Sequence, residues 1–80
     1  MSHSYSMGVE VDHHSNLRKE ASSNSEIVSE VPQGAQMIAD PVNIDTPDDS
    51  ECTSWLAVEY RMSESVTLEG YICAALVHAT

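Results

Sequence analysis

The chain has 80 residues, and 13 Asp and Glu side chains outnumber 3 Lys and Arg side chains, which gives a net charge of −10. This charge repels nucleic-acid phosphates and anionic lipid surfaces, so we expect no direct binding to nucleic acid. A chain of this length buries only about 60–65% of the surface that its unfolded form exposes, and it contains no Phe. Its core must be small and aliphatic, which favours short strands over a large enzyme pocket.

Two segments bear on membranes and secretion. The longest apolar run, Tyr71–Val77, is far shorter than the roughly 20 residues of a membrane span, so we expect no membrane insertion. The segment 1–14 lacks the basic start and the apolar stretch of a secretory signal. This leaves two origins open, a cytoplasmic protein or a secreted protein whose signal has been removed. We predict a flexible segment over residues 1–6 and a single domain over residues 7–80.

The first half of the chain predicts three strands. Apolar and other residues alternate over Met7–Val11, which is typical of a strand. Residues 12–25 are polar and contain one large apolar side chain, Leu17, so we predict a long ordered loop held by that leucine. Apolar patterns return over Glu26–Val31 and over Ala35–Ala39. The Pro-Gln-Gly sequence between them predicts a tight turn joining two strands.

An acidic segment without apolar periodicity follows, over Val42–Ser50 and its neighbours. It carries four carboxylates of particular interest, Asp45, Asp48, Asp49 and Glu51. The Asp-x-Asp-x-Asp-Gly spacing of a calcium loop is absent. We therefore predict a solvated and flexible loop of about a dozen residues.

Two clear alternations near the C-terminus predict a hairpin. Trp55–Tyr60 places Leu56, Val58 and Tyr60 on one face, and Val66–Cys73 alternates in the same way. Residues 74–77 predict a single helical turn followed by a short closing strand. The pattern as a whole predicts an all-β fold, a small partly open barrel of five or six short antiparallel strands with no substantial helix.

Cys52 and Cys73 allow one disulfide and are too few for a cysteine zinc site. A bridge would stabilise the fold by on the order of 3 kcal/mol. Strand parity places Cys73 on the outward face and Cys52 on the opposite one, so a bridge requires the chain between them to bend. Both states stay open, and two half-buried thiols in a reducing compartment are the preferred interpretation.

Several short motifs occur in a fixed order: Asn16-Leu17-Arg18, Ile27-Val28, Gly34, Trp55-Leu56-Ala57-Val58 and Gly70-Tyr71-Ile72. This order resembles the bacterial SH3-like domain family, whose pattern runs Leu-Asn-Val-Arg, Gly-Pro-Ser, a valine-isoleucine strand, a turn glycine, Trp-x-x-Val and Gly-Trp-Val. The resemblance covers roughly residues 7–77. The chain departs from the pattern where Glu20-Ala21-Ser22 replaces Gly-Pro-Ser, where Tyr71 replaces a tryptophan, and in a longer, more acidic loop before Trp55.

The resemblance implies both a structure and a role. In such a barrel the polar residues 12–25 form the long loop after the first strand, Leu17 fills the core and Arg18 braces the loop by hydrogen bonds. The implied role is that of a non-enzymatic recognition module, often attached to cell-wall enzymes, which binds a peptide, a peptidoglycan peptide or a protein partner.

The candidate contact residues are aromatic. Trp55 and Tyr71 share the outward face of the predicted hairpin, and an even register would make them cross-strand neighbours in a surface patch that docks partner side chains. Tyr60 has inward parity and is the weakest of the three candidates. In the alternative, Trp55 only closes the end of the barrel beneath the long polar loop, and both interpretations stay open.

The charge supports a second hypothesis for function. An acidic inhibitor, or a decoy that mimics nucleic acid, would occupy a basic groove on a partner protein. Its contact residues would be Asp45, Asp48, Asp49 and Glu51. Such binding weakens steeply as salt is added, whereas binding through an aromatic patch does not.

We predict no catalytic site, no metal and no cofactor. Asp12-His13-His14 resembles a metal motif of a phosphoesterase family, but that chemistry requires further Asp and His ligands on a larger scaffold. We also expect no catalysis by a Cys73 nucleophile with His78 as its base, because no group orients the histidine and no oxyanion-hole motif is present. A glycine-rich phosphate loop is missing as well. We therefore expect a non-enzyme.

Overall fold

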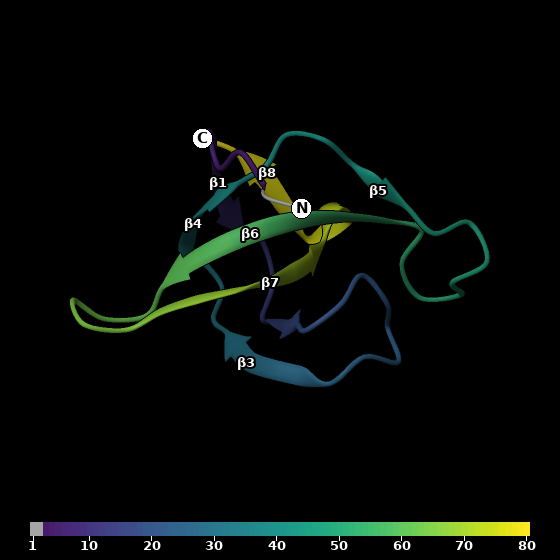
Figure 1. Ribbon diagram of the computed structural model, residues 1–80, viewed down its shortest axis with the longest axis horizontal. Helices are drawn as coiled ribbons and strands as arrows, with labels where there is room; N and C mark the ends of the chain where they lie inside the picture. The colour runs from purple at the N-terminus through teal and green to yellow at the C-terminus, as the bar shows by residue number, and fades with distance from the viewer. Residues whose placement is uncertain (1–2) are drawn as a thin grey trace.

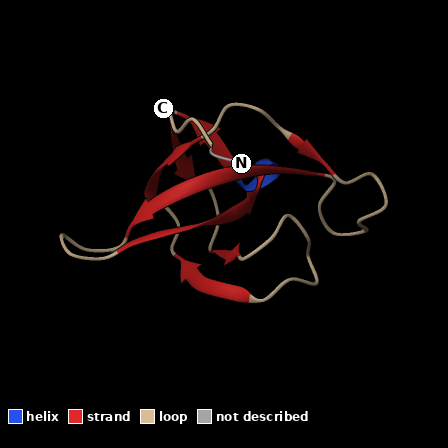
Figure 2. Ribbon diagram, viewed as in Figure 1, coloured by secondary structure: helices blue, strands red, loops and turns tan. Residues whose placement is uncertain are grey.

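The computed structural model describes residues 3–80, and this part of the chain forms eight strands in one antiparallel sheet (Figure 1). The strands are β1 (Met7–Val11), β2 (Ser15–Arg18), β3 (Ile27–Val31), β4 (Gln36–Ala39), β5 (Ile44–Asp45), β6 (Ser54–Arg61), β7 (Thr67–Cys73) and β8 (Val77–Ala79). Within residues 3–80 the one helical element is the 3-10 turn η1 (Ala74–Leu76) (Figure 2). No helix in this described part is long and apolar enough to cross a membrane.

The strands follow the order β3-β2-β7-β6-β4-β1-β8, and β5 pairs with β6. The longest pairing is the β6–β7 hairpin, which runs along the long axis of a molecule of 36 × 23 × 22 Å (Figure 1). The sheet curls around its inward face but does not close, because β3 and β8 at its ends do not pair with each other. The predicted all-β, partly open barrel is therefore confirmed.

One cluster of inward-facing side chains forms the core. Its buried members are Val9, Val11, Leu17, Val31, Met37, Ala39, Leu56, Val58 and Ile72. They come from six strands because alternate residues of each strand point to the same face of the sheet. Leu17 is 0% exposed, as expected for a side chain that fills the core, and a fully buried leucine stabilises a fold by about 1.5–3 kcal/mol.

A glycine allows β2 and β7 to lie close together beside Leu17. A Cβ atom at Gly70 would lie 2.6 Å from the carbonyl oxygen of Arg18 and 2.9 Å from Cγ of Leu17. Atoms do not approach this closely, so a side chain at this position would push the two strands apart. The hydrogen at Gly70 therefore permits the central pairing between the two halves of the sheet.

The structure has more strands than the five or six that we predicted, since β2 and β5 were assigned to loops. Neither shows an alternation of apolar residues in the sequence. β2 contains only one large apolar side chain, Leu17, and β5 has only two residues. The turn between β3 and β4 is present, with Gly34 at a φ of 86°. The two strands that it joins lie far apart in the sheet, as β3 pairs with β2 and β4 pairs with β1.

Candidate functional site

The predicted aromatic pair lies on one face of the hairpin but does not form a surface patch. Trp55 is paired with Cys73, and Tyr71 is paired with Ala57, so the two aromatic residues are diagonal rather than direct neighbours. Trp55 is 3% exposed, and its Nε1 donates a hydrogen bond of 3.0 Å to Oγ1 of Thr46. Trp55 thus lies beneath a loop, as in the alternative interpretation. That interpretation expected the long polar loop over Trp55, whereas the covering residue, Thr46, belongs to the acidic loop.

Tyr60, the third aromatic candidate, is partly buried and packs against the core. Its ring therefore helps to cover the inward face near the turn of the β6–β7 hairpin, as its inward parity indicated. Tyr71 is half-buried on the opposite face of the sheet. The three aromatic residues do not come together in one site.

Cys52 and Cys73 form a disulfide, with their Cα atoms 5.9 Å apart. Our preference for two reduced thiols was wrong. The parity argument failed because Cys52 precedes β6, which begins at Ser54, and side chains outside a strand do not follow its alternation. The bridge ties the end of the acidic loop to β7, directly beside Trp55.

The disulfide lies at the side of a hollow of about 200 Å³, which we call the disulfide groove. Its lining comes from β2, the polar loop after β2, the acidic loop with the start of β6, the end of β7 and the turn η1. Its lining residues are Asn16, Arg18, Ser23, Glu51, Cys52, Trp55, Cys73, Ala75 and Leu76. Apolar atoms of Trp55, Leu76 and the disulfide therefore meet a cationic and an anionic side chain in one concave surface.

Arg18 links the groove to the long polar loop. Its Nη1 donates a hydrogen bond of 2.9 Å to the carbonyl oxygen of Ser25, which is the bracing contact that the resemblance implied. This hydrogen bond restrains the guanidinium, and Arg18 is among the residues that line the groove. A restrained cation loses little side-chain entropy when it binds a carboxylate or a carbonyl group of a ligand.

The acidic loop is held to the polar loop by Asp49. Its Oδ1 accepts hydrogen bonds from Oγ of Ser23, N of Glu51 and N of Cys52, and its Oδ2 accepts one from N of Ser23, all at 2.8–3.1 Å. The hydrogen bonds from Ser23 and the neighbouring amides hold the pKa of the Asp49 carboxyl far below its ordinary value. Asp49 is thus an organiser of the loop, whereas Asp45, Asp48 and Glu51 are exposed.

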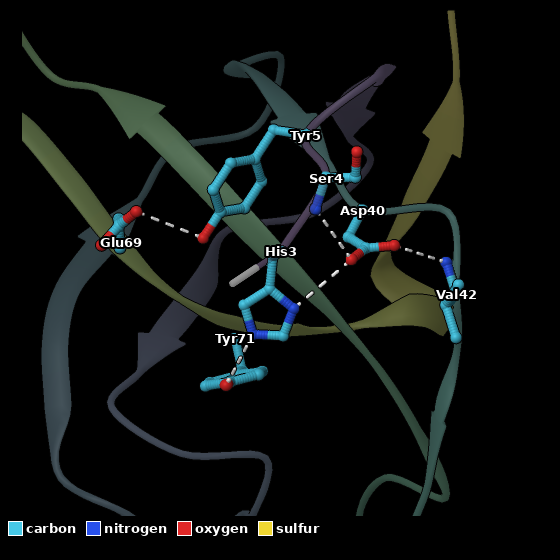
Figure 3. A network of polar contacts seen from close by, with 7 residues as sticks. All are labelled: His3, Ser4, Tyr5, Asp40, Val42, Glu69 and Tyr71. Carbon is cyan, nitrogen blue, oxygen red and sulfur yellow. Dashed lines mark hydrogen bonds and ion pairs between the residues drawn. The ribbon is translucent and has the colours of Figure 1, made fainter. Parts of the chain in front are cut away.

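A second polar network lies over Tyr71 and includes residues that the sequence analysis did not identify (Figure 3). The His3 ring lies between two partners, with Nε2 3.2 Å from Oη of Tyr71 and Nδ1 3.3 Å from Oδ2 of Asp40. Asp40 also accepts hydrogen bonds from N of Val42 and N of Ser4. These backbone hydrogen bonds, with a smaller contribution from His3, lower the pKa of the Asp40 carboxyl.

Tyr5 adds a further contact to this network, since its Oη donates a hydrogen bond of 3.3 Å to Oε1 of Glu69 (Figure 3). Partial burial and the charge of Glu69 raise the pKa of the Tyr5 hydroxyl. These contacts, with a hydrogen bond of 3.0 Å from N of Ser6 to O of Ala39, connect residues 3–6 of the segment that we predicted to be flexible to the sheet, and residues 1–2 lie outside the described residues. No sequence signal identified this segment, because it has no apolar periodicity.

Two of the sites considered from the sequence can be compared with the described residues. Cys73 has no free thiol, because it is bridged. Across residues 3–80 no group of three His, Cys, Asp or Glu side chains is arranged to hold a metal ion. Two exposed histidines each lie beside a carboxylate. Nε2 of His14 lies 3.1 Å from Oε1 of Glu30, and Nδ1 of His78 lies 2.5 Å from Oδ1 of Asp12.

Comparisons with known proteins give no further assignment. No protein-family model, no curated protein and no solved structure matched the chain. The shape and chemistry of the disulfide groove, together with the charge of the surface around it, are therefore the basis for a function.

Proposed function

We propose that the chain is a non-enzymatic recognition module, similar to bacterial SH3-like domains, that binds a peptide or protein partner in the disulfide groove. The observation that supports it is the lining of the groove, where Trp55, Leu76 and the disulfide lie together with Arg18 and Glu51. The apolar atoms accommodate a small aliphatic group of a ligand. The two charged side chains bind the polar peptide groups on either side of it.

The disulfide groove is too small to enclose a whole small-molecule ligand. Pockets that enclose a small-molecule ligand measure about 300–1,000 Å³, whereas the disulfide groove measures about 200 Å³. It accommodates one or two side chains of a longer ligand and leaves the remainder on the surface. Peptidoglycan peptides, the ligands that the resemblance implies, combine small methyl groups with amines and carboxylates and fit this description.

Ala75 offers a direct test of the groove. It is exposed on η1 and lines the groove, so Ala75→Phe places a ring in the groove without disturbing the core. Ala79→Phe, on β8 and outside the groove lining, is the matched control. We would select ligands from displayed random peptides and from purified peptidoglycan fragments, and measure their dissociation constants at low and high salt.

We expect selected ligands to bind the unchanged chain and the Ala79→Phe variant equally, with little effect of salt. Ala75→Phe should weaken binding by about 10-fold or more, because it fills the space that the ligand occupies. Equal binding to both variants would show that the groove is not the site. Failure to select any ligand from either source would contradict the recognition-module proposal itself.

An acidic decoy is a second candidate, and one specific observation favours it. Asp45, Asp48 and Glu51 are exposed, and all ion pairs of residues 3–80 involve histidine, so no Lys or Arg neutralises these carboxylates within 4.0 Å. A decoy would bind a basic protein with an affinity that falls steeply with salt. Its binding would survive Ala75→Phe and would be lost when the three carboxylates are replaced by amides.

A further inference from the structure

A second hollow lies between the N-terminal segment and β7, and we call it the tyrosine hollow. It measures about 260 Å³. Pockets that enclose a whole small molecule measure about 300–1,000 Å³, so this hollow has the size for the head group of a larger ligand. Its lining residues are His3, Tyr5, Lys19, Glu69, Gly70 and Tyr71, and none of them lines the disulfide groove.

Three aromatic rings contribute to the walls of the tyrosine hollow. Figure 3 shows the His3 ring between Tyr5 and Tyr71, with Glu69 beside Tyr5. The centroid of the His3 ring lies 6.0 Å from that of Tyr5 and 5.8 Å from that of Tyr71. The ring planes meet at 47° and 83°, so the rings are not stacked face to face. All three side chains are half-buried, which leaves part of each accessible to a ligand.

Hydrogen bonds hold these rings by their edges. Nε2 of His3 lies 3.2 Å from Oη of Tyr71, and Nδ1 of His3 lies 3.3 Å from Oδ2 of Asp40. A neutral His3 with its proton on Nδ1 satisfies both contacts, because it donates to Asp40 and accepts from Tyr71. Oη of Tyr5 donates to Oε1 of Glu69 at 3.3 Å. These contacts order the rings before a ligand binds, which lowers the entropy cost of binding.

The tyrosine hollow is also electronegative. Glu69 lies two positions before Tyr71 on the same face of β7, and Glu59 is its direct cross-strand neighbour. Partial burial and the charges of Glu69 and Glu59 raise the pKa of the Tyr5 hydroxyl, so the negative potential of both carboxylates reaches an aromatic wall. The faces of aromatic rings carry negative partial charge as well. A cation in the hollow would therefore be attracted by ring faces and by carboxylates.

We propose that the tyrosine hollow binds a quaternary ammonium group, as carried by a trimethylated lysine side chain or by choline. Such a cation is attracted to the faces of aromatic rings that lie within about 6 Å. An unmethylated lysine has three N–H donors, which would lack acceptors among ring faces, whereas a quaternary ammonium has none. This site goes beyond the proposed function, because it requires no contact in the disulfide groove.

Four small probes separate charge, methylation and source of the ligand. The first is acetyl-Nε-trimethyllysine methylamide. The second replaces its trimethylammonium by an uncharged tert-butyl group, the third is the unmethylated lysine compound, and the fourth is choline. We would titrate the chain with each probe and follow backbone amide shifts by NMR, which gives the dissociation constants and locates the site.

We expect the trimethyllysine compound to shift residues 69–71 and to bind about 10-fold more tightly than the tert-butyl and lysine compounds. Tighter binding of choline than of the trimethyllysine compound would identify a choline-bearing ligand, and the reverse would identify a methylated peptide. Both results support a quaternary ammonium site. Equal binding of the tert-butyl compound would overturn it, and so would the absence of shifts with both quaternary compounds at about 10 mM.

Variants test the ring wall and the carboxylate separately. Tyr5 precedes β1 and lies outside the core cluster, so its replacement should leave the fold intact, as amide spectra would verify. Tyr5→Ala should weaken binding about 10-fold, whereas Tyr5→Phe keeps the ring and should weaken it less than about 3-fold. Glu69→Gln should weaken binding about 5-fold. Its control is Glu64→Gln at an exposed position, with less than about 2-fold.

Lys19 provides one more prediction, since it is the one Lys or Arg among the lining residues. Lys19→Gln should tighten binding about 2-fold, because it removes a like charge. Equal losses in Glu69→Gln and Glu64→Gln would overturn the proposal in favour of general attraction by the acidic surface. Equal losses in Tyr5→Ala and Tyr5→Phe would overturn the role of the ring. Weaker binding in Ala75→Phe would place the ligand in the disulfide groove and also overturn the proposal.

Discussion

At the scale of single residues, Asp49 connects two loops that lie 26 positions apart in the sequence, because its carboxylate accepts hydrogen bonds from N and Oγ of Ser23. The same carboxylate accepts hydrogen bonds from the amides of Glu51 and Cys52. A carboxylate that accepts several N–H and O–H groups is stabilised in its charged form. One residue therefore shapes the acidic loop over Trp55 and the rim of the disulfide groove.

The low pKa of Asp49 predicts an acid-sensitive contribution to stability. Its folded-state pKa lies below the ordinary value of 3.8, so this contribution is complete well above pH 3.8 and is lost as the pH falls through the folded-state pKa. Asp49→Asn should lower the urea midpoint at neutral pH, since an amide nitrogen would then face a hydrogen-bond donor of Ser23 or of the neighbouring amides. The measurement is the urea midpoint of the unchanged chain and of Asp49→Asn between about pH 7 and pH 2.

The difference in urea midpoint between the unchanged chain and Asp49→Asn should shrink toward the acidic end. Asp48→Asn is the matched control, because Asp48 is exposed and has no hydrogen bond to its side chain among the described residues. Asp48→Asn should leave the midpoint at neutral pH nearly unchanged. A constant difference across the pH range would show that the Asp49 charge does not stabilise the loop.

Trp55 shows how far residue patterns define a site. Alternation placed Trp55 and Tyr71 on the same face of the hairpin, and the register confirms that placement. Exposure depends on what covers a face, and Trp55 is covered through Thr46, nine positions earlier in the chain. No periodicity encodes such a contact. The neighbours of Tyr71 were missed for the same reason, since His3 reaches it across 68 positions.

At the scale of elements, every strand except β2 and β5 was predicted, and the longest strands gave the clearest signal. In β1, β6 and β7 the residues of one face alternate with those of the other over five or more positions, and this period of two is typical of a strand. β2 is a strand because its neighbours β3 and β7 supply hydrogen-bond partners, and Leu17 fills the space between them. Pairing between distant segments thus decides such short strands, and a local pattern does not contain that information.

The disulfide joins two elements and should control the cover over Trp55. It links residues 21 positions apart, and closing a loop of this length stabilises a fold by about 3 kcal/mol in the chain-entropy model. Reduction, or Cys52→Ala/Cys73→Ala, should lower the free energy of unfolding by about that amount. Trp55 is the one tryptophan of the chain, so its fluorescence reports directly on the site.

We expect the Trp55 emission to shift to longer wavelength after reduction under native conditions, because the acidic loop is then held over the ring by fewer constraints. Urea unfolding with and without reductant gives the free energies. The double alanine variant serves as the control, since its emission and stability should not respond to reductant. An unchanged emission and urea midpoint in the reduced chain would show that the hydrogen bonds of Asp49 and Thr46 hold the loop without the bridge.

At the scale of the whole molecule, the acidic charge is distributed without cationic partners. Every ion pair among residues 3–80 involves a histidine, and no Lys or Arg lies within 4.0 Å of a carboxylate. Like charges brought together by folding repel each other and lower stability. The fold therefore tolerates a net negative field that attracts basic ligands, and three exposed carboxylates of the acidic loop, Asp45, Asp48 and Glu51, contribute to it.

This self-repulsion predicts that salt stabilises the protein. Raising NaCl from about 0.02 M to about 0.5 M shortens the screening length well below the size of the molecule, so the free energy of unfolding should rise by on the order of 1 kcal/mol. The triple variant Asp45→Asn/Asp48→Asn/Glu51→Gln carries three fewer negative charges on exposed positions and should show a smaller rise. Urea unfolding at each salt concentration measures both slopes. A free energy that is independent of salt, or equal slopes in the two forms, would mean that the exposed acidic loop adds no repulsion in the folded state, and the loop would then lose its main support as a surface that attracts basic partners.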